Sequence, residues 1–357
     1  MIIENTTKLD IPESGKISRK LGVFYNPLMK FNRDISVLLI NALGQDLRAA
    51  DPLAGSGVRA IRFLKECKNV KEVYANDVSK EAVENMTKNA KLNDVKFSIS
   101  NMDANRFLLE STGFDYIDVD PFGSPNPFLQ SAIIRLSRES ILAVTATDTA
   151  PLSGTYPEAC LRKYWAKPMN NYLMHEVGLR ILIRKVQLVG AEMEKALVPI
   201  FSYSKDHYFR IFFRCEKHKS AVDKVLEQHG YLVHCDSCLD RWVSKDIFSK
   251  KCKKNHKIDY AGPLWLGNLW DEKLAERMLK LNKDKETAEF LKIILKESKI
   301  QVVGFYDMHA AAKAYKKNSS PMSEVIEKLK KNKVSRTHFN PHSIRSDINL
   351  KNFLRVV

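Results

Sequence analysis

The chain has few cysteines and no long apolar run, and both absences restrict what it can be. Six cysteines in 357 residues are too few for the disulfide framework of a secreted protein, and Cys67, Cys160 and Cys215 are scattered. No apolar run approaches the roughly 20 residues that span a bilayer. Residues 1–5 lack the basic start and the apolar stretch of a signal peptide. We therefore expect a cytoplasmic protein with no membrane association.

The chain also lacks internal repeats and low-complexity segments, and its 357 residues exceed one comfortable hydrophobic core. Two domains are therefore expected.

Charge is spread unevenly between the two expected domains. Residues 231–357 hold 26 Lys and Arg against 15 Asp and Glu, a net of +11, whereas residues 1–230 hold 32 against 27, a net of +5. The positive C-terminal part indicates a polyanionic partner; a lysine-rich solvated surface is the alternative.

A pair of glycines marks a candidate ligand-binding turn in the segment from Ala49 to Arg59. Gly55 and Gly57 permit a tight turn that brings backbone close to a ligand at a helix N-terminus. Asp77 ends a second predicted strand twenty residues after Gly57. At that spacing a nucleotide-binding sheet presents a carboxylate to ribose hydroxyls.

Two further acids indicate the kind of cofactor. Asp103 follows a predicted strand, where its carboxylate can lie beside an adenine amino group. Asp51 stands just before the glycines, where it would repel a pyrophosphate. These acids favour a cationic cofactor, and S-adenosylmethionine carries adenosine and a sulfonium without phosphates. A nicotinamide dehydrogenase is the weaker interpretation.

The apolar strand from Phe114 ends abruptly in Asp120-Pro121-Phe122-Gly123. This ending suits a planar amine. The exocyclic amine of a nucleobase is a poor nucleophile, because its lone pair is delocalised into the ring. An enzyme that alkylates it must accept its protons and fix the ring. Asp120 and the Pro121 carbonyl can accept these hydrogen bonds while Phe122 stacks. The alternative is an ordinary strand-terminating turn.

Short motifs spread over nearly the whole chain resemble those of the tRNA guanine-26 N2-dimethyltransferase family. The resemblance implies a class I methyltransferase domain, S-adenosylmethionine as donor, guanine in tRNA as acceptor, two methyl additions and a family-specific C-terminal domain. The motifs are Phe24-Tyr25-Asn26-Pro27, Phe31-Asn32-Arg33-Asp34, Asp120-Pro121-Phe122-Gly123-Ser124-Pro125, Ala146-Thr147-Asp148 and Ser335-Arg336-Thr337-His338-Phe339.

The resemblance also assigns individual residues to the cofactor. It implies that Arg33, Asp77, Asp103 and Ala104 contact S-adenosylmethionine, with Arg59 as a further member. An arginine is the natural partner of the methionine carboxylate, because its planar fork binds a carboxylate in a bidentate way. For Arg33 the alternative is a solvated helix residue, and for Asp77 it is a helix N-cap.

The predicted fold class is α/β, with a Rossmann-like class I methyltransferase sheet and a smaller α+β C-terminal domain. We expect a helix-rich N-terminal segment, then alternating strands and helices over residues 48–147. A long helix over about 171–195 follows, and a hairpin of 196–203 with 208–215 closes the edge of the sheet. A helix over 220–228 leads to a boundary at Gly230. Residues 1–230 then form the methyltransferase domain and residues 231–357 the basic tRNA-binding domain.

The remaining three cysteines form a cluster with metal-ligand spacing. Cys235 and Cys238 are followed, after thirteen residues, by Cys252 and then by His256. This Cys-x2-Cys and Cys-x3-His pattern predicts a structural zinc ion bound by Cys235, Cys238, Cys252 and His256. The fourth ligand is the open point, since His234 is an alternative. Reduced surface thiols are the other interpretation.

Basic and aromatic residues are interleaved near the C-terminus, where they suit phosphate contacts and base stacking. Tyr164 and Trp165, by contrast, are expected to pack in the interior. The interleaved residues are Lys313, Tyr315, Lys316, Lys317, Lys328, Lys330, Lys331, Lys333, Arg336, His338, Phe339, His342 and Arg345.

No obligate protein partner is evident. Two alternative functions remain open: a methyltransferase for another exocyclic amine in DNA or tRNA, and a zinc-containing RNA-binding protein with a degenerate cofactor fold.

Overall fold

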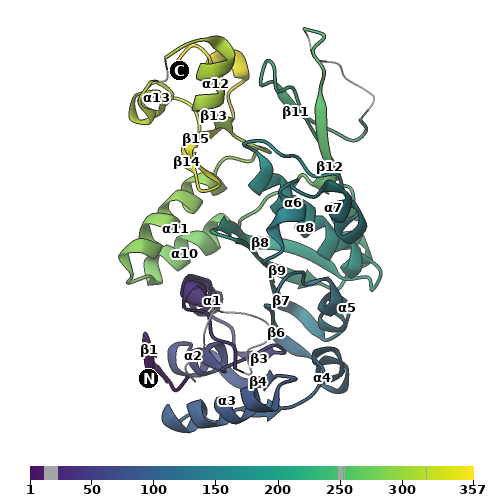
Figure 1. Ribbon diagram of the computed structural model, residues 1–357, viewed down its shortest axis with the longest axis vertical. Helices are drawn as coiled ribbons and strands as arrows, with labels where there is room; N and C mark the ends of the chain where they lie inside the picture. Colours follow the sequence, from purple (N-terminus) through teal and green to yellow (C-terminus); the bar gives the residue numbers. More distant parts are fainter. Residues whose placement is uncertain (12–22, 248–251, 253, 319) are drawn as a thin grey trace.

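A computed structural model describes residues 1–11, 23–247, 252, 254–318 and 320–357 of the chain. Two lobes follow one another along its long axis, with the N-terminus in one and the C-terminus in the other (Figure 1). In the part of the chain that is described, no helix combines the length and the apolar character needed to cross a bilayer.

A seven-stranded sheet forms the centre of the larger lobe. Its strand order is β5-β4-β3-β6-β7-β9-β8, with β9 antiparallel to both of its neighbours and the first five strands parallel. This is the Rossmann-like sheet with a closing hairpin that the sequence predicts. The strands are β3 Leu47–Asp51, β4 Val70–Asn76, β5 Ser98–Ser100, β6 Phe114–Val119, β7 Leu136–Ala146, β8 Ala196–Lys205 and β9 Tyr208–Glu216.

Helices cover both faces of this sheet, α1, α2 and α3 on one and α4, α5 and α8 on the other (Figure 1). The long helix α8 is buried on nearly all sides, charged Glu176, Arg180 and Lys185 included, because it lies between the sheet and the smaller lobe. The helices of this lobe are η1 Pro27–Met29, α1 Lys30–Leu43, α2 Val58–Glu66, α3 Lys80–Leu92, α4 Ala104–Glu110, α5 Asn126–Ile134, α6 Thr149–Leu152, α7 Pro157–Tyr164, α8 Met174–Ala191 and α9 Lys219–Leu226.

The first residues differ from the predicted helix-rich segment. Strands β1 (Ile2–Glu4) and β2 (Thr7–Leu9) form a short antiparallel hairpin against α2 and α3. The pattern is alternating: Thr7 and Leu9 are fully buried and Lys8 is exposed. Among the residues that the structure describes, the first helical element is η1.

The C-terminal part is α+β, as predicted. It contains two three-stranded antiparallel sheets, β11-β10-β12 and β13-β15-β14, with helices between and after them. Its elements are β10 His229–His234, β11 Arg241–Ser244, β12 Asp259–Trp265, α10 Glu272–Leu281, α11 Lys285–Ser298, β13 Tyr306–Asp307, α12 Met308–Tyr315, α13 Met322–Lys328, β14 Val334–Thr337, β15 Asn340–Ser346 and α14 Leu350–Phe353.

The two parts share much of one hydrophobic core. The main cluster continues from α8 through Leu232, Trp265 and Leu274, while a separate small cluster is built mostly from residues 306–357. Gly230 lies inside β10, where a Cβ atom would stand 2.6 Å from the Ser244 carbonyl oxygen. Glycine there permits close strand packing. A truncation after Gly230 would therefore expose apolar surface of both parts.

Candidate active site and metal centre

Five acidic side chains meet at the carboxyl edge of the parallel strands. Asp51 ends β3, and the others directly follow β4, β5, β6 and β7 or begin the loops after them. Ligands of open α/β sheets bind at this edge. The predicted cofactor and amine residues are thus brought together from distant parts of the sequence. The acids are Asp51, Asp77, Asp103, Asp120 and Asp148.

The glycine turn after β3 has the shape that the sequence predicts. Gly55 and Gly57 have φ of +53° and +75°. A Cβ atom on Gly55 would lie 2.7 Å from the Phe24 carbonyl oxygen, and one on Gly57 would lie 2.5 Å from Cγ of Met86. Any side chain at either position would force the turn apart. The turn leads directly into α2 and so presents backbone N–H groups at the sheet edge.

Asp77 and Asp103 are held by backbone donors. The Asp77 carboxylate accepts hydrogen bonds from the Gly55 amide at 2.9 Å and from the Ser79 amide at 3.0 Å, and the side chain is half-buried. Asp103 is exposed and caps α4, whose first residue, Ala104, is buried. A carboxylate has about four acceptor positions, so both acids retain capacity for ribose hydroxyls or an adenine amine.

Arg33 is buried in an ion-pair network with the N-terminal hairpin. Its guanidinium binds Glu4 in a bidentate way, with Nε to Oε1 at 2.7 Å, and Arg62 binds the same carboxylate at 2.8 Å. Burial alone would raise the pKa of Glu4, but Arg33 and Arg62 lower it to about 2. The fork expected to bind a methionine carboxylate is thus occupied by a carboxylate of the chain itself.

Arg59 lies nearest to the residues predicted to orient the amine. It contacts the carboxylates of Asp118, at 3.1 Å, and of Asp120. It also donates to Ser36 at 3.1 Å and to the Asn32 side-chain oxygen at 3.0 Å. Arg59 is 5% exposed, and its position is fixed by these four partners, of which three are buried and Asp120 is half-buried.

A second buried arginine, Arg210 of β9, holds Asp118 from the other side at 2.6 Å. Burial would raise the pKa of Asp118, but Arg210 and Arg59 lower it. Within the described part of the chain, no basic side chain forms such an ion pair with Asp51. Burial raises its pKa to about 7, and the charges of Asp118 and Asp120 add to the rise although Arg59 opposes it. Asp51 is therefore the acid of this cluster that takes up a proton near neutrality.

The loop Asp120-Pro121-Phe122-Gly123 is fastened to the loop after β7. The Gly123 amide donates to the Thr147 hydroxyl at 2.6 Å, and the Thr147 amide donates to the Gly123 carbonyl at 3.0 Å. Phe122 is 38% exposed, and Phe24 meets its ring edge-on at 4.2 Å between centroids. These rings form an aromatic corner beside Asp120, as a site for a planar ring requires.

Sequence reasoning missed Phe24 as a site residue, together with Asn32, Asp118 and Arg210. Phe24 and Asn32 belong to motifs that carry the family resemblance, and that membership was the available signal. Nothing in the sequence marks Arg210, because its partner Asp118 is 92 positions away.

The predicted zinc ligands gather at one point. The ligand atoms of Cys235, Cys238, Cys252 and His256 all lie within 4.8 Å of one another. Cys235 Sγ is 3.5 Å from His256 Nδ1, and Cys238 Sγ is 3.5 Å from Cys252 Sγ. Four ligands at about 2.0 to 2.3 Å from a tetrahedral ion stand roughly 3.5 to 3.8 Å apart. The three thiols and the imidazole therefore fit a closed zinc site.

His234, the alternative fourth ligand, is occupied elsewhere. It is fully buried, with Nε2 at 2.9 Å from the Tyr172 hydroxyl and Nδ1 at 3.0 Å from Asp236. Both ring nitrogens thus have partners, and the geometry favours His256.

Three of the predicted RNA-contacting residues are instead interior. Arg345 is fully buried and binds Glu176 at 2.7 Å and Glu297 at 3.0 Å, and His338 binds Glu297 at 2.6 Å. Phe339 is also buried and stacks on Phe305. These predictions were wrong, because Arg345 and His338 pair with acids of α8 and α11 and Phe339 packs on Phe305, so that none of the three side chains faces solvent. The predicted lysines, Arg336 and His342 are exposed, and Tyr315 is half-buried.

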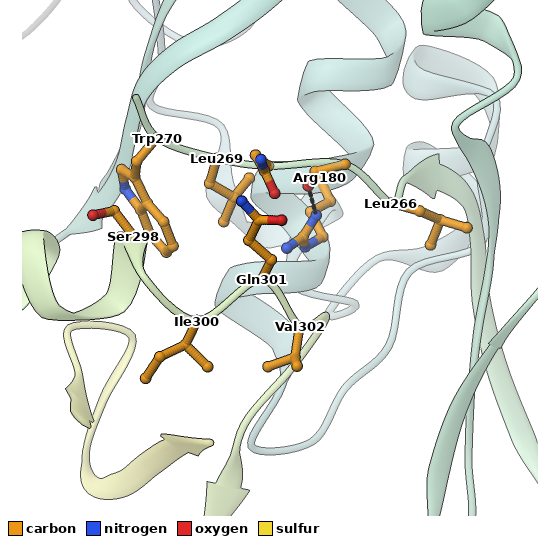
Figure 2. A pocket seen from close by; sticks show the side chains of 10 residues that line it. Arg180, Leu266, Leu269, Trp270, Ser298, Ile300, Gln301 and Val302 are labelled. Carbon is orange, nitrogen blue, oxygen red and sulfur yellow. Dashed lines mark hydrogen bonds between the residues drawn. The ribbon is translucent and has the colours of Figure 1, made fainter. Parts of the chain in front are cut away.

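A small cavity at the junction of the lobes is too small to be the binding site of a nucleoside or of its cofactor. It has a volume of about 30 Å³. Figure 2 shows Arg180 at its wall, where the guanidinium donates to the Gly267 carbonyl at 2.8 Å. That space is sufficient for an ordered water molecule and too small for a nucleoside.

Known proteins resemble the chain over its whole length. Residues 4–357 match the sequence profile of N2,N2-dimethylguanosine tRNA methyltransferase. A tRNA (guanine(26)-N(2)/guanine(27)-N(2))-dimethyltransferase of Aquifex aeolicus is 42% identical, covering 99% of this chain and 95% of its own. A tRNA (guanine(26)-N(2))-dimethyltransferase of Methanocaldococcus jannaschii is 38% identical, with coverages of 99% and 97%.

A solved structure, that of Trm1 from Pyrococcus horikoshii in complex with S-adenosyl-L-methionine, has the same fold. Its TM-score is 0.90 at 35% identity, and the match covers 99% of this chain and 98% of that one. The sheet, the acids at its edge and these full-length matches agree, and the chain belongs to the N2,N2-dimethylguanosine tRNA methyltransferase family.

Proposed function

We propose that the chain transfers methyl groups from S-adenosylmethionine to the exocyclic N2 of guanine-26 in tRNA, twice, to give N2,N2-dimethylguanosine. The observation that carries this proposal is the position of the Asp120 loop. A carboxylate, a proline carbonyl and an aromatic corner lie at the same sheet edge as the acids and the glycine turn suited to adenosine.

The residues at the edge suit S-adenosylmethionine. Asp77 is positioned to accept from the ribose hydroxyls and Asp103 to accept from the adenine amine, with Ala104 against the base. The turn at Gly55 and Gly57 allows backbone to approach without side chains. When bound, the cofactor supplies an electrophilic methyl group on a cationic sulfur.

Arg33 binds Glu4 through Nε and Nη2, along one edge of its guanidinium. A guanidinium has five N–H donors and can bind two carboxylates at once, as Arg59 does with Asp118 and Asp120. Arg33 can therefore take the methionine carboxylate without releasing Glu4.

Asp120 and the Pro121 carbonyl accept the two N2–H hydrogens of guanine and so direct the nitrogen lone pair at the methyl group. In the methyl transfer that the bound cofactor would support, Asp120 would also accept the one proton that N2 gives up. A strong base is not required, because the methylated nitrogen is acidic. Phe122 and Phe24 hold the ring, and catalysis rests largely on positioning.

Arg59 positions Asp120. Its contact with one carboxylate oxygen leaves the other for the amine, and Asp118 with Arg210 keeps Arg59 in place. This assignment differs from the cofactor role that the family resemblance suggests for Arg59.

The tRNA presents guanine-26 stacked, so the base has to turn out into the site at a cost of a few kcal/mol. Phosphate contacts by the basic residues 231–357 can offset that cost, whereas residues 1–230 carry out the chemistry.

Zinc bound by Cys235, Cys238, Cys252 and His256 would be structural, because four protein ligands leave no open position. An enzyme that acts on tRNA is expected in the cytoplasm.

Guanine-27 is a second candidate acceptor, since the name of the Aquifex aeolicus relative gives both guanine-26 and guanine-27.

Mass spectrometry of nucleosides from unmodified tRNA, incubated with the protein and S-adenosylmethionine, tests the proposed methylation of guanine N2. N2,N2-dimethylguanosine supports the proposal. Methylation of an adenine or cytosine amine, or of no base, would refute it.

A further inference from the structure

An exposed apolar surface flanks α7 and has no part in the proposed mechanism. Tyr156 is 60% exposed, Leu161 59% and Trp165 47%. Tyr156 caps the start of the helix, and Trp165 stands directly after its end. Single exposed hydrophobic residues are normal, but grouped large ones indicate an interaction site.

Trp165 is held rigidly although it is exposed. Its φ of +55° lies in the left-handed region, which is rare for a bulky side chain and indicates that its surroundings impose the position. Lys185 Nζ lies 3.1 Å from the ring centroid, and Arg184 donates to the Trp165 carbonyl at 3.4 Å. Leu161 is one turn earlier, since the Trp165 amide donates to its carbonyl. Leu161 and Trp165 are thus both exposed at the C-terminal end of α7.

Helix α7 is tied directly to the loop that carries Asp120. The Tyr164 hydroxyl lies 2.9 Å from the Ser124 hydroxyl and donates to Asp148 at 2.7 Å. Asn126 donates to the Lys163 carbonyl at 2.8 Å. Trp165 follows Tyr164 in the chain, so the exposed surface and the site share one framework. Figure 1 shows α6 and α7 beside α8.

The charge around this surface is mixed, with an excess of cations. Arg162 is exposed on α7 and Lys185 lies beneath the ring. Lys163 pairs with Asp148 and Lys167 with Asp259, and Glu158 is an acid on α7. Rigid aromatic rings among cations match the composition of surfaces that bind unpaired nucleotides.

We propose that Trp165, together with Leu161 and Tyr156, forms a stacking surface for an unpaired nucleotide of tRNA that neighbours the guanine turned into the site. This inference rests on the proposed function. When one base leaves the stack its neighbour loses a partner, and Trp165 supplies a replacement ring close to where the target base enters.

The test compares Trp165→Ala, Trp165→Phe and Leu161→Ala with the intact enzyme. Leu109→Ala is the matched control: Leu109 is 44% exposed on α4, which starts at the carboxyl edge with Asp103 and runs to the opposite edge of the sheet. Trp165→Ala should raise the Kd for tRNA roughly 5- to 150-fold, the loss expected for one stacked base. Trp165→Phe should recover most of that loss, Leu161→Ala should show a smaller one, and Leu109→Ala none.

The Kd for S-adenosylmethionine and the melting temperature should stay the same in all four variants. Unchanged tRNA affinity in Trp165→Ala would overturn the inference, and would leave a protein partner as the better candidate for this surface. Failure of the intact enzyme to methylate tRNA would instead refute the proposed function, so the two outcomes are separable.

Discussion

Arg59 contacts the carboxylate of Asp120 across 61 positions of sequence, and through Asp118 it is linked to Arg210 on the antiparallel strand β9. The acid proposed to receive the guanine amine is therefore not a lone side chain at a strand end. Its orientation is set by a buried arginine. The roles of the two residues can be separated by experiment.

We expect Asp120→Asn to lower kcat by roughly 100-fold or more, because proton acceptance and orientation typically contribute that much. S-adenosylmethionine affinity should be kept. Arg59→Met should lower kcat similarly in the intact enzyme and add little in the Asp120→Asn background, since coupled residues are not additive. Arg59→Lys should restore part of the activity. Multiplicative effects, with S-adenosylmethionine affinity lost in Arg59→Met alone, would assign Arg59 to the cofactor.

Substitution of Asp77 should weaken the binding of S-adenosylmethionine and leave the rate of methyl transfer unchanged. We expect Asp77→Ala to weaken S-adenosylmethionine binding by about 1.5 to 3 kcal/mol, the net value of hydrogen bonds to a charged group. Calorimetry measures this directly, and kcat at saturating cofactor should be nearly unchanged. Asp77→Asn is the conservative control, because its amide oxygen can still accept from the Gly55 amide. Equal affinities for all three proteins would exclude Asp77 from the site.

Asp51 should make stability depend on pH in the direction opposite to an ordinary ion-paired acid. Its pKa is raised to about 7 in the folded state, so between about pH 4 and 7 the folded protein binds more protons than the unfolded chain. The contribution of Asp51 to the free energy of unfolding therefore falls as pH rises through this window, by at most about 1.4 kcal/mol per pH unit.

The comparison protein is Asp51→Asn, which cannot ionise. Without S-adenosylmethionine, its stability relative to the wild type should increase from pH 5 to pH 8 in denaturant titrations. Parallel stability curves for the two proteins would mean that Asp51 is ionised throughout.

The zinc prediction concerns the smaller lobe. Protein purified without chelator should contain one tightly bound zinc per chain, and Cys235→Ser should lose it and loosen that lobe. Binding of tRNA should then weaken more than binding of S-adenosylmethionine. His234→Gln serves as the control and should retain zinc, because the ring nitrogens of His234 contact Tyr172 and Asp236 and not the zinc ligands. Protein free of zinc in elemental analysis would reject the site.

The sequence predicts features that depend on neighbours in the chain. Acids at the ends of parallel strands meet at one edge by geometry, and the Cys-x2-Cys and Cys-x3-His spacing brings four ligands together. Exposure is different, because it depends on distant partners. Arg345 has the composition of an RNA contact, yet Glu176, 169 positions away, fixes it in the interior. Trp165 was expected to pack, but it stands just beyond the end of α7, where its left-handed backbone turns the ring outward; Tyr164 is buried as expected.

The central claim is that the enzyme methylates N2 of guanine-26, with the amine held by the Asp120 loop. Mapping the methylated position in tRNA tests this claim most directly. Two transcripts of one tRNA that differ only by guanine or adenine at position 26 are incubated with the protein and S-adenosylmethionine, and their nuclease fragments are analysed by mass spectrometry. We predict two methyl groups on guanine-26 in the first transcript and none in the second, with similar affinities, since backbone contacts position the tRNA. Equal dimethylation of both transcripts at another guanine would contradict the claim.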